Sequence, residues 1–87
     1  MKNKYKEGDV VLVENDGHYN LLKIDTVRGD VEKPLYDDIG LRVDLENNFD
    51  IGFPATDIGI SHKKVREIES DSPLMQIAND ESRFVIQ

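Results

Sequence analysis

Apolar and polar residues alternate most regularly in the middle of the chain. Apolar residues occupy the odd positions from Ile39 to Leu45, whereas the even positions from Gly40 to Glu46 hold glycine or charged residues. This period of two predicts a strand with one buried face. Residues 47–48 are asparagines and predict a turn, and residues 49–53 alternate again as a partner strand that ends at Pro54.

The N-terminal part of the chain predicts a β-hairpin. Its first strand is the apolar, largely β-branched run Val10–Val13, and its second strand extends from Tyr19 to Val27. Between them, residues 15–17 have the sequence Asn-Asp-Gly, which tolerates the positive φ angles of a tight turn. Because the first run has no polar member, its pattern does not indicate which of its side chains face the core.

The C-terminal part allows more than one prediction. Residues 56–60 predict a short turn or a further strand, and residues 63–68 predict a strand that returns to the sheet. Ser72 before Pro73 is typical of a helix start, with Leu74, Ile77 and Ala78 on one face. Residues 74–78 and 83–86 also fit a hairpin. We prefer the hairpin, because residues 84–86 need a partner strand and the alternative helix is short.

Short strands separated by turn signals predict an antiparallel all-β domain, and a small barrel would leave few exposed strand edges. The pattern Lys6-x-Gly8-Asp9-x-Val11-x-Val13, followed by Lys23-Ile24-x-x-Val27, resembles the opening of SH3-like small barrels, including KOW-type and Tudor-like modules. This resemblance implies an SH3-like barrel and a binding module rather than an enzyme. We expect the barrel over residues 1–70 and a C-terminal extension, a hairpin or short helix, over residues 71–87. The expected core consists of Val11, Val13, Leu22, Ile24, Ile39, Leu41, Val43, Leu45, Phe49, Ile51, Phe53, Ile58 and Ile68.

Composition and charge narrow the classes of function. The chain has 87 residues, no cysteine and a formal net charge of −7. We expect one domain without disulfides, in the cytoplasm, as a monomer or small homo-oligomer. No apolar segment is long enough to predict a signal peptide or a membrane span. The negative charge makes nucleic acid an unfavoured partner, so we expect the partner to be another protein.

No group of residues predicts catalysis, a cofactor or a metal site. His18 and His62 have no second ligand at metal-binding spacing, and we expect His18 to be a solvated turn residue. Ser61 precedes His62, but adjacent side chains of a strand point to opposite faces. Consecutive carboxylates of an extended chain diverge, so Asp37 and Asp38 do not predict acid–base catalysis. Pro34 and Gly40 lie near them and predict a solvated acidic loop instead. We therefore expect a protein that is not an enzyme.

Three sets of residues are candidates for binding. The acidic set comprises Asp37, Asp38, Asp44, Glu46, Asp50 and Asp57, for which solubility is the alternative explanation. The basic set comprises His62, Lys63, Lys64 and Arg66, which also fit a charged edge strand. The aromatic set is Tyr19 and Tyr36, which could line a peptide groove.

These sets support three hypotheses of function. The first is a non-enzymatic protein-interaction module. The second is an acidic inhibitor, of the kind found in phages and mobile elements, that imitates nucleic acid in the basic groove of a nucleic-acid enzyme. The third is weak binding of nucleic acid through residues 62–66.

Overall fold

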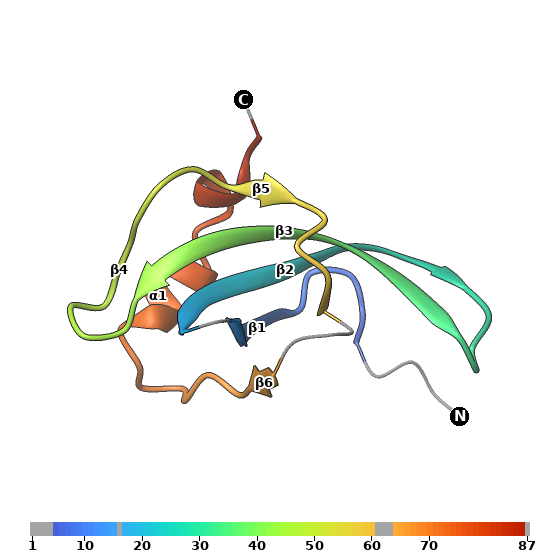
Figure 1. Cartoon of the computed structure of the whole chain (residues 1–87), viewed down its shortest axis with the longest axis horizontal. Coiled ribbons are helices and arrows are strands. Elements are labelled where there is room, and N and C mark those ends of the chain that lie inside the picture. Colours follow the sequence, from blue (N-terminus) through green and yellow to red (C-terminus); the bar gives the residue numbers. More distant parts are fainter. Residues whose placement is uncertain (1–4, 16, 61–63, 87) are drawn as a thin grey trace.

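A computed structural model describes residues 5–15, 17–60 and 64–86 of the chain. The structure confirms the all-β fold class (Figure 1). Its elements are the strands β1 (Val10–Asn15), β2 (His18–Gly29), β3 (Pro34–Asp44), β4 (Phe49–Asp50), β5 (Ala55–Thr56) and β6 (Lys64–Arg66), the helix α1 (Leu74–Ala78) and the 3-10 helix η2 (Glu81–Phe84). No helix among these residues is long and apolar enough to cross a membrane.

The strands form one antiparallel sheet in the order β4-β3-β2-β1-β6, with β5 also paired to β3. Among the described strands, β4 and β6 lie at opposite ends of this order, and the sheet is not closed into a barrel. The long strands β2 and β3 curve across the molecule, and their far ends project from it as a two-stranded arm (Figure 1). The sheet therefore has a packed part around β1 and β2 and a more exposed arm.

The predicted N-terminal hairpin is confirmed. β1 pairs with β2 from Val10 opposite Lys23 to Asn15 opposite His18, which leaves a two-residue connection. Gly17 in this connection has a φ of 77°, a conformation that glycine adopts without steric cost. The sequence pattern thus located both the strands and their turn.

The first strand has no polar face because both of its faces are buried. Val10 and Leu12 belong to a cluster on one side of the sheet, and Val11 and Val13 to a cluster on the other. The first cluster is built on Leu12, Leu21, Leu41, Val43, Leu74, Ile77 and Phe84, and the second on Val13, Leu22, Ile24 and Ile60. An apolar run without alternation is what a strand buried on both faces requires.

Different segments cover the two faces. Leu74 and Ile77 of α1, with Phe84 of η2, cover the face of the first cluster, and in Figure 1 α1 lies behind β2 and β3. Ile58 and Ile60 cover the opposite face, where the segment after β5 crosses in front of the sheet. The sheet is therefore the middle layer of the molecule.

The preferred prediction of a C-terminal hairpin is wrong, and the alternative short helix is present. The Ser72 Oγ accepts a hydrogen bond from the Leu74 N–H at 3.2 Å, at the start of α1. Phe84 needs no partner strand, because its side chain is buried against the sheet from a 3-10 turn. The expected boundary between a barrel over residues 1–70 and an extension over residues 71–87 stays a prediction.

Residues 49–53 do not form the predicted buried strand. Phe49 and Asp50 pair with β3, and the Ile51 N–H donates to the Arg42 carbonyl at 2.8 Å, after which Gly52, with a φ of 89°, turns the chain out of this pairing. The sheet face below is already filled by α1 and η2, so the apolar residues of this segment remain outside. Phe49, Ile51 and Phe53 were predicted to be core residues and are exposed.

The remaining core predictions fare better. Val13, Leu22, Ile24, Leu41 and Val43 are buried, and Val11, Ile39, Leu45, Ile58 and Ile68 are partly buried against the two clusters. The prediction missed Leu12, Leu21, Ile60, Leu74, Ile77, Ala78 and Phe84. Most of the missed residues belong to the second face of a strand or to the two short helices.

Gly40 allows Ile58 to approach β3 closely, which gives the first testable prediction. A Cβ atom at Gly40 would lie 2.3 Å from Ile58 Cγ1 and 2.8 Å from Leu22 Cδ2. We expect Gly40→Ala to lower the free energy of unfolding by about 1–3 kcal/mol, as overpacked cores do. Urea denaturation of Gly40→Ala, Ile58→Ala and the double variant would measure this. The double variant should lose less stability than the two single variants together, because Ile58→Ala removes the atom that lies nearest to the added Cβ. Strictly additive losses in the free energy of unfolding would contradict this packing.

Candidate interaction surface

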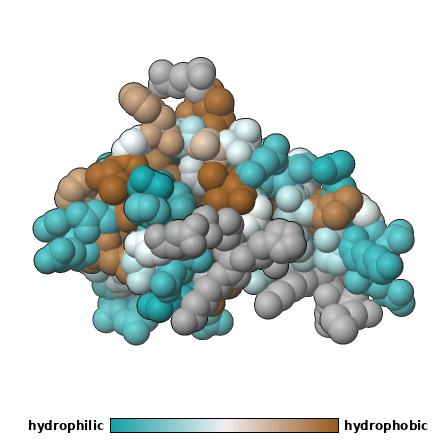
Figure 2. All heavy atoms as spheres, viewed as in Figure 1, coloured by the Kyte–Doolittle hydropathy of each residue, from teal (hydrophilic) through white to brown (hydrophobic). Residues whose placement is uncertain are grey.

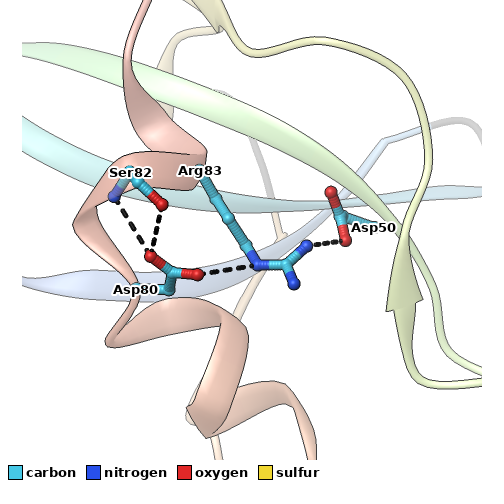
Figure 3. Close-up of polar contacts among 4 residues, drawn as sticks. All are labelled: Asp50, Asp80, Ser82 and Arg83. Atoms are coloured by element: carbon cyan, nitrogen blue, oxygen red, sulfur yellow. Dashed lines mark hydrogen bonds and ion pairs between the residues drawn. The ribbon is translucent and has the colours of Figure 1, made fainter.

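Arg83 links the C-terminal segment to β4. Its Nη1 donates a hydrogen bond to Asp50 Oδ1, and its Nε donates to Asp80 Oδ2 at 3.1 Å (Figure 3). Asp80 also accepts from the N–H and the hydroxyl of Ser82, at 3.2 and 2.6 Å. These bonds, the Ser82 hydroxyl first and Arg83 after it, lower the pKa of Asp80. The arrangement fixes the guanidinium group between two carboxylates at the surface.

Exposed apolar side chains lie beside this polar cluster. Phe53, which is 92% exposed, and Val85, which is 57% exposed, line one hollow together with Arg83, and Phe49 lines another. Ile86 is exposed next to Val85 in the chain, whereas Ile51 is exposed at a hollow beside His18. Figure 2 shows hydrophobic residues gathered near the C-terminal end of the described chain, at the top of the view. Grouped exposed apolar residues are typical of binding surfaces, whereas single ones are not.

Two hollows adjoin Arg83. One, of about 320 Å³, lies between β4 and α1 and is lined in part by Phe49 and Ile77. The other, of about 250 Å³, lies between Phe53 with Pro54 and the end of η2 with Val85. Arg83 lines both. We call these two hollows and the side chains that line them the Arg83 groove.

Nearly all of the net charge lies in two stretches of the sequence, each of which includes residues of the groove. Residues 43–57 and 67–86 together contain nine acidic residues and one basic residue, Arg83. The rest of the chain contains nine acidic and ten basic residues. Of these nine acids, Asp50 and Asp80 line the groove and pair with Arg83, whereas Asp44 and Glu46 line a separate hollow beside His18 and Glu67 lines the hollow beside Tyr5.

The predicted acidic set is divided between these parts. Asp44, Glu46, Asp50 and Asp57 lie in the acidic segments, whereas Asp37 and Asp38 lie in the first half of β3. Asp44 accepts hydrogen bonds from the Glu46 N–H at 2.9 Å and the Asn47 side chain at 2.8 Å, which lowers its pKa, the Asn47 side chain most. Glu46 and Asp57 are exposed. The set therefore does not form one face.

The prediction that Asp37 and Asp38 form a solvated loop is wrong, because β3 begins at Pro34 and includes both. A bulge in β2 between Ile24 and Thr26 lets the pairing continue this far. As expected, the two side chains diverge. Asp37 is on the outer side, where Arg28 donates to it from Nε and Nη2 at 2.8 and 3.0 Å and the Thr26 hydroxyl donates at 2.5 Å.

Asp38 is 2% exposed and holds the segment after β5 against the sheet. Its Oδ1 accepts a hydrogen bond from the Ile58 N–H at 2.8 Å, and its Oδ2 accepts from the Gly59 N–H at 3.0 Å. Its backbone carbonyl accepts from the Asp57 N–H at 2.9 Å. Both carboxylate oxygens are thus used, and Asp38 has a structural role that the sequence pattern did not indicate.

The predicted basic set lies largely outside the described residues. His62 and Lys63 are not described, and of Lys64 only the backbone pairing with Glu14 is. Arg66 Nη2 donates to Glu14 Oε1 at 3.0 Å, and its guanidinium carbon lies 5.7 Å from the centre of the Tyr19 ring. The one described member of the set therefore has an anionic partner.

The two candidate groove tyrosines lie on opposite faces of the sheet. Tyr19 packs against the cluster that contains Phe84, under Arg66. Tyr36 packs against the other cluster and contacts the Tyr5 ring edge to face, with ring centres 5.4 Å apart. The structure does not bring them together into one groove.

Other features of the described chain give less support for a binding site than the Arg83 groove does. A hollow of about 600 Å³ lies beside Tyr5, Val11 and Arg66. His18 is exposed at the first position of β2, as expected. Within residues 5–15, 17–60 and 64–86, no three histidine or acidic side chains are grouped as metal ligands would be.

Comparison with protein-family models, with curated proteins and with solved structures gives no match for this chain. The case for a function therefore depends on the molecule itself. The sequence prediction missed Arg83, Phe53 and Val85 as surface residues. Two signals point to them: Gly52 and Pro54 flank Phe53, and Arg83 is the one base in a long acidic stretch.

The role of Asp38 gives a second prediction. Asp38→Ala would leave two backbone N–H groups without an acceptor, and we expect the free energy of unfolding to fall by about 1–3 kcal/mol. Hydrogen exchange should show faster exchange of the Ile58 and Gly59 amides. Asp38→Asn, which keeps one acceptor oxygen, should have a smaller effect. Unchanged protection of both amides in Asp38→Ala would contradict the contact.

The pair of Arg28 and Asp37 gives a prediction of pH dependence. The hydrogen bonds from Arg28, and then that from Thr26, lower the pKa of Asp37. A carboxylate with a lowered folded-state pKa stabilises the fold above its unfolded-state pKa of about 3.9, and this stabilisation is lost as the pH falls through the folded-state value.

Arg28→Gln should raise the pKa of Asp37 toward its ordinary value, although Thr26 still donates. NMR titration of the Asp37 carboxyl carbon would measure this shift. Urea denaturation between neutral and acidic pH should show a shallower loss of stability for the variant. Identical titration curves for Asp37 in both proteins would exclude a role for Arg28.

Proposed function

We propose that this protein is a non-enzymatic protein-interaction module, related in architecture to the SH3-like small barrels but with an open sheet, that binds a partner protein through the Arg83 groove. The observation that carries the proposal is the position of Phe53, which is 92% exposed and lines one hollow together with Val85. A partner that covers Phe53 would gain about 1.5–3 kcal/mol from burial of that side chain alone. Aromatic anchors of this kind dominate the energy of many interfaces.

Arg83 supports the same proposal. Arginine is enriched in interfaces, and this one is held in place by two carboxylates before any partner arrives. A fixed side chain loses less conformational entropy on binding than a mobile one. The groove thus combines apolar contacts with a pre-ordered polar group.

The SH3-like architecture is supported by the N-terminal hairpin and by the way the chain enters it. Gly8, with a φ of 90°, donates to the Ile24 carbonyl at 2.8 Å, and the Ile24 N–H donates to the Asp9 carbonyl at 2.8 Å. The Gly-Asp pair before β1 therefore pairs with β2, as the resemblance implies. A cytoplasmic location and a monomeric or small oligomeric state belong to this proposal.

The charge distribution favours one alternative, the acidic inhibitor of a nucleic-acid enzyme. Residues 43–57 and 67–86 hold the excess of acidic residues, and Glu46 among them is exposed. The exposed apolar side chains of Phe53 and Val85 favour the interaction module. The groove in which a nucleic-acid enzyme binds phosphates is polar, so it would offer these side chains few apolar contacts. Binding of nucleic acid through residues 62–66 stays a prediction with less support, since Arg66 already pairs with Glu14.

Affinity capture with matched variants of the intact chain tests the proposed function. Phe53→Ser removes the exposed anchor, whereas Val31→Ser changes a residue that is 57% exposed on the distant arm. We expect a specific protein partner to be retained by the natural chain and by Val31→Ser, and its affinity for Phe53→Ser to fall by at least ~1 kcal/mol. Quantitative mass spectrometry and titration calorimetry with the identified partner would measure this.

The same experiment separates the alternatives. Loss of the partner with Glu46→Gln and Asp57→Asn, combined with full binding by Phe53→Ser, would favour the acidic inhibitor. Absence of any specific protein at every salt concentration would overturn the proposed function. Equal urea midpoints for the variants would show that they remain folded.

A further inference from the structure

We infer that the Arg83 groove is a conditional site, which exists only while residues 72–86 lie closed against the sheet, and that the ion pair of Arg83 with Asp50 favours the closed state. We call residues 72–86 the C-terminal strap. The inference rests on the proposed function and concerns the regulation of the same site. It requires that the strap opens as a unit while the sheet stays folded.

Both hollows of the groove have one wall from the strap and one wall from the segment that follows β3. Residues 48–50 and residues of α1 line the first hollow, whereas Phe53 and Pro54 line the second with the end of η2. Arg83 belongs to the strap and lines both. When the strap leaves the sheet, each hollow therefore loses a wall and the groove no longer exists.

Few polar contacts hold the strap to the sheet. Its backbone hydrogen bonds stay within residues 69–86, as from the Asn79 N–H to the Met75 carbonyl at 3.0 Å. The bond from Arg83 to Asp50 is the only hydrogen bond that the described residues show between the strap and a strand (Figure 3). Both side chains are partly exposed, and an ion pair of this kind is weak and sensitive to salt.

The apolar contacts of the strap come from very short helices. Leu74, Ile77 and Phe84 are the strap side chains that pack into the first cluster. They belong to helices of five and four residues, and isolated helices of this length are not stable in water. A hollow of about 280 Å³ also lies between α1 and the start of β1. Because the strap has no stable structure of its own, it opens as one unit when these contacts are lost.

The sheet keeps its hydrogen bonds and one core cluster without the strap. β2 pairs with β1 and β3, and the cluster built on Val13, Leu22, Ile24 and Ile60 contains no residue of the strap. Parts of a fold with few buried contacts open at a lower free energy than its central strands. Opening of the strap therefore costs less than unfolding of the sheet.

Native-state hydrogen exchange of the intact chain, followed by NMR at increasing urea concentrations, tests this inference. The amides of Asn79, Asp80 and Arg83 are bonded inside the strap and report its opening. We expect these three amides to share one opening free energy, below that of the amides of β2 and β3. Their exchange should also depend less on urea, because opening exposes less surface than unfolding. Equal free energies and equal urea dependence for strap and sheet amides would overturn the inference.

Two matched variants separate opening of the strap from unfolding of the chain. Arg83→Gln removes the ion pair of the strap and should speed exchange of the strap amides roughly 2- to 5-fold, the factor that corresponds to a surface ion pair. Arg28→Gln removes the exposed pair with Asp37 on the arm, which persists when the strap opens, and should leave the strap amides unchanged. If both variants speed the strap amides alike, the strap opens only with the whole fold and the inference fails.

A captured partner whose affinity depends on Phe53 gives a second readout. Because such a partner binds only the closed state, it should slow exchange of the strap amides, roughly 10-fold at a free concentration of about ten times its Kd. Unchanged exchange of these amides in the complex would overturn the inference and leave the proposed function standing. Failure of the proposed function is a separate result, since the capture experiment then yields no protein partner while the urea series still measures opening of the strap.

Discussion

The structure depends on a sheet whose central strands must be covered on both faces. Leu21 and Leu22 are adjacent in β2, point to opposite sides and are both fully buried. One antiparallel sheet of this size has no second sheet to pack against, so short segments supply the cover. Two aspartate contacts hold them in place. Asp38 binds the backbone of the segment after β5, and Asp50 binds Arg83 of the C-terminal segment.

β-Branched and apolar runs predicted β1 and β2, and period-two alternation predicted the second half of β3. These local patterns could not predict what covers the strands. The cover depends on contacts between residues far apart in sequence, such as those of Phe84 with β1 and β2. Asp38 was misjudged for the same reason: a carboxylate looks solvated until the N–H groups of Ile58 and Gly59, twenty residues later, are placed beside it.

The candidate site is a consequence of which segments cover the faces of the sheet. The C-terminal segment took the core positions that residues 49–53 were expected to fill, and Phe53 was left outside with the apolar character of a core residue. Arg83, held by Asp50 and Asp80 and lining both hollows, adds a fixed polar group to this exposed apolar region. Together the two features describe a surface on which apolar and polar contacts lie side by side.

The contribution of α1 and η2 to the core has a consequence for the order of events during synthesis. Leu74, Ile77 and Phe84 complete the cluster that β1, β2 and β3 begin. While the chain is being made, the sheet would therefore present one uncovered apolar face until residue 84 has left the ribosome. Such transient faces are prone to association with other nascent chains.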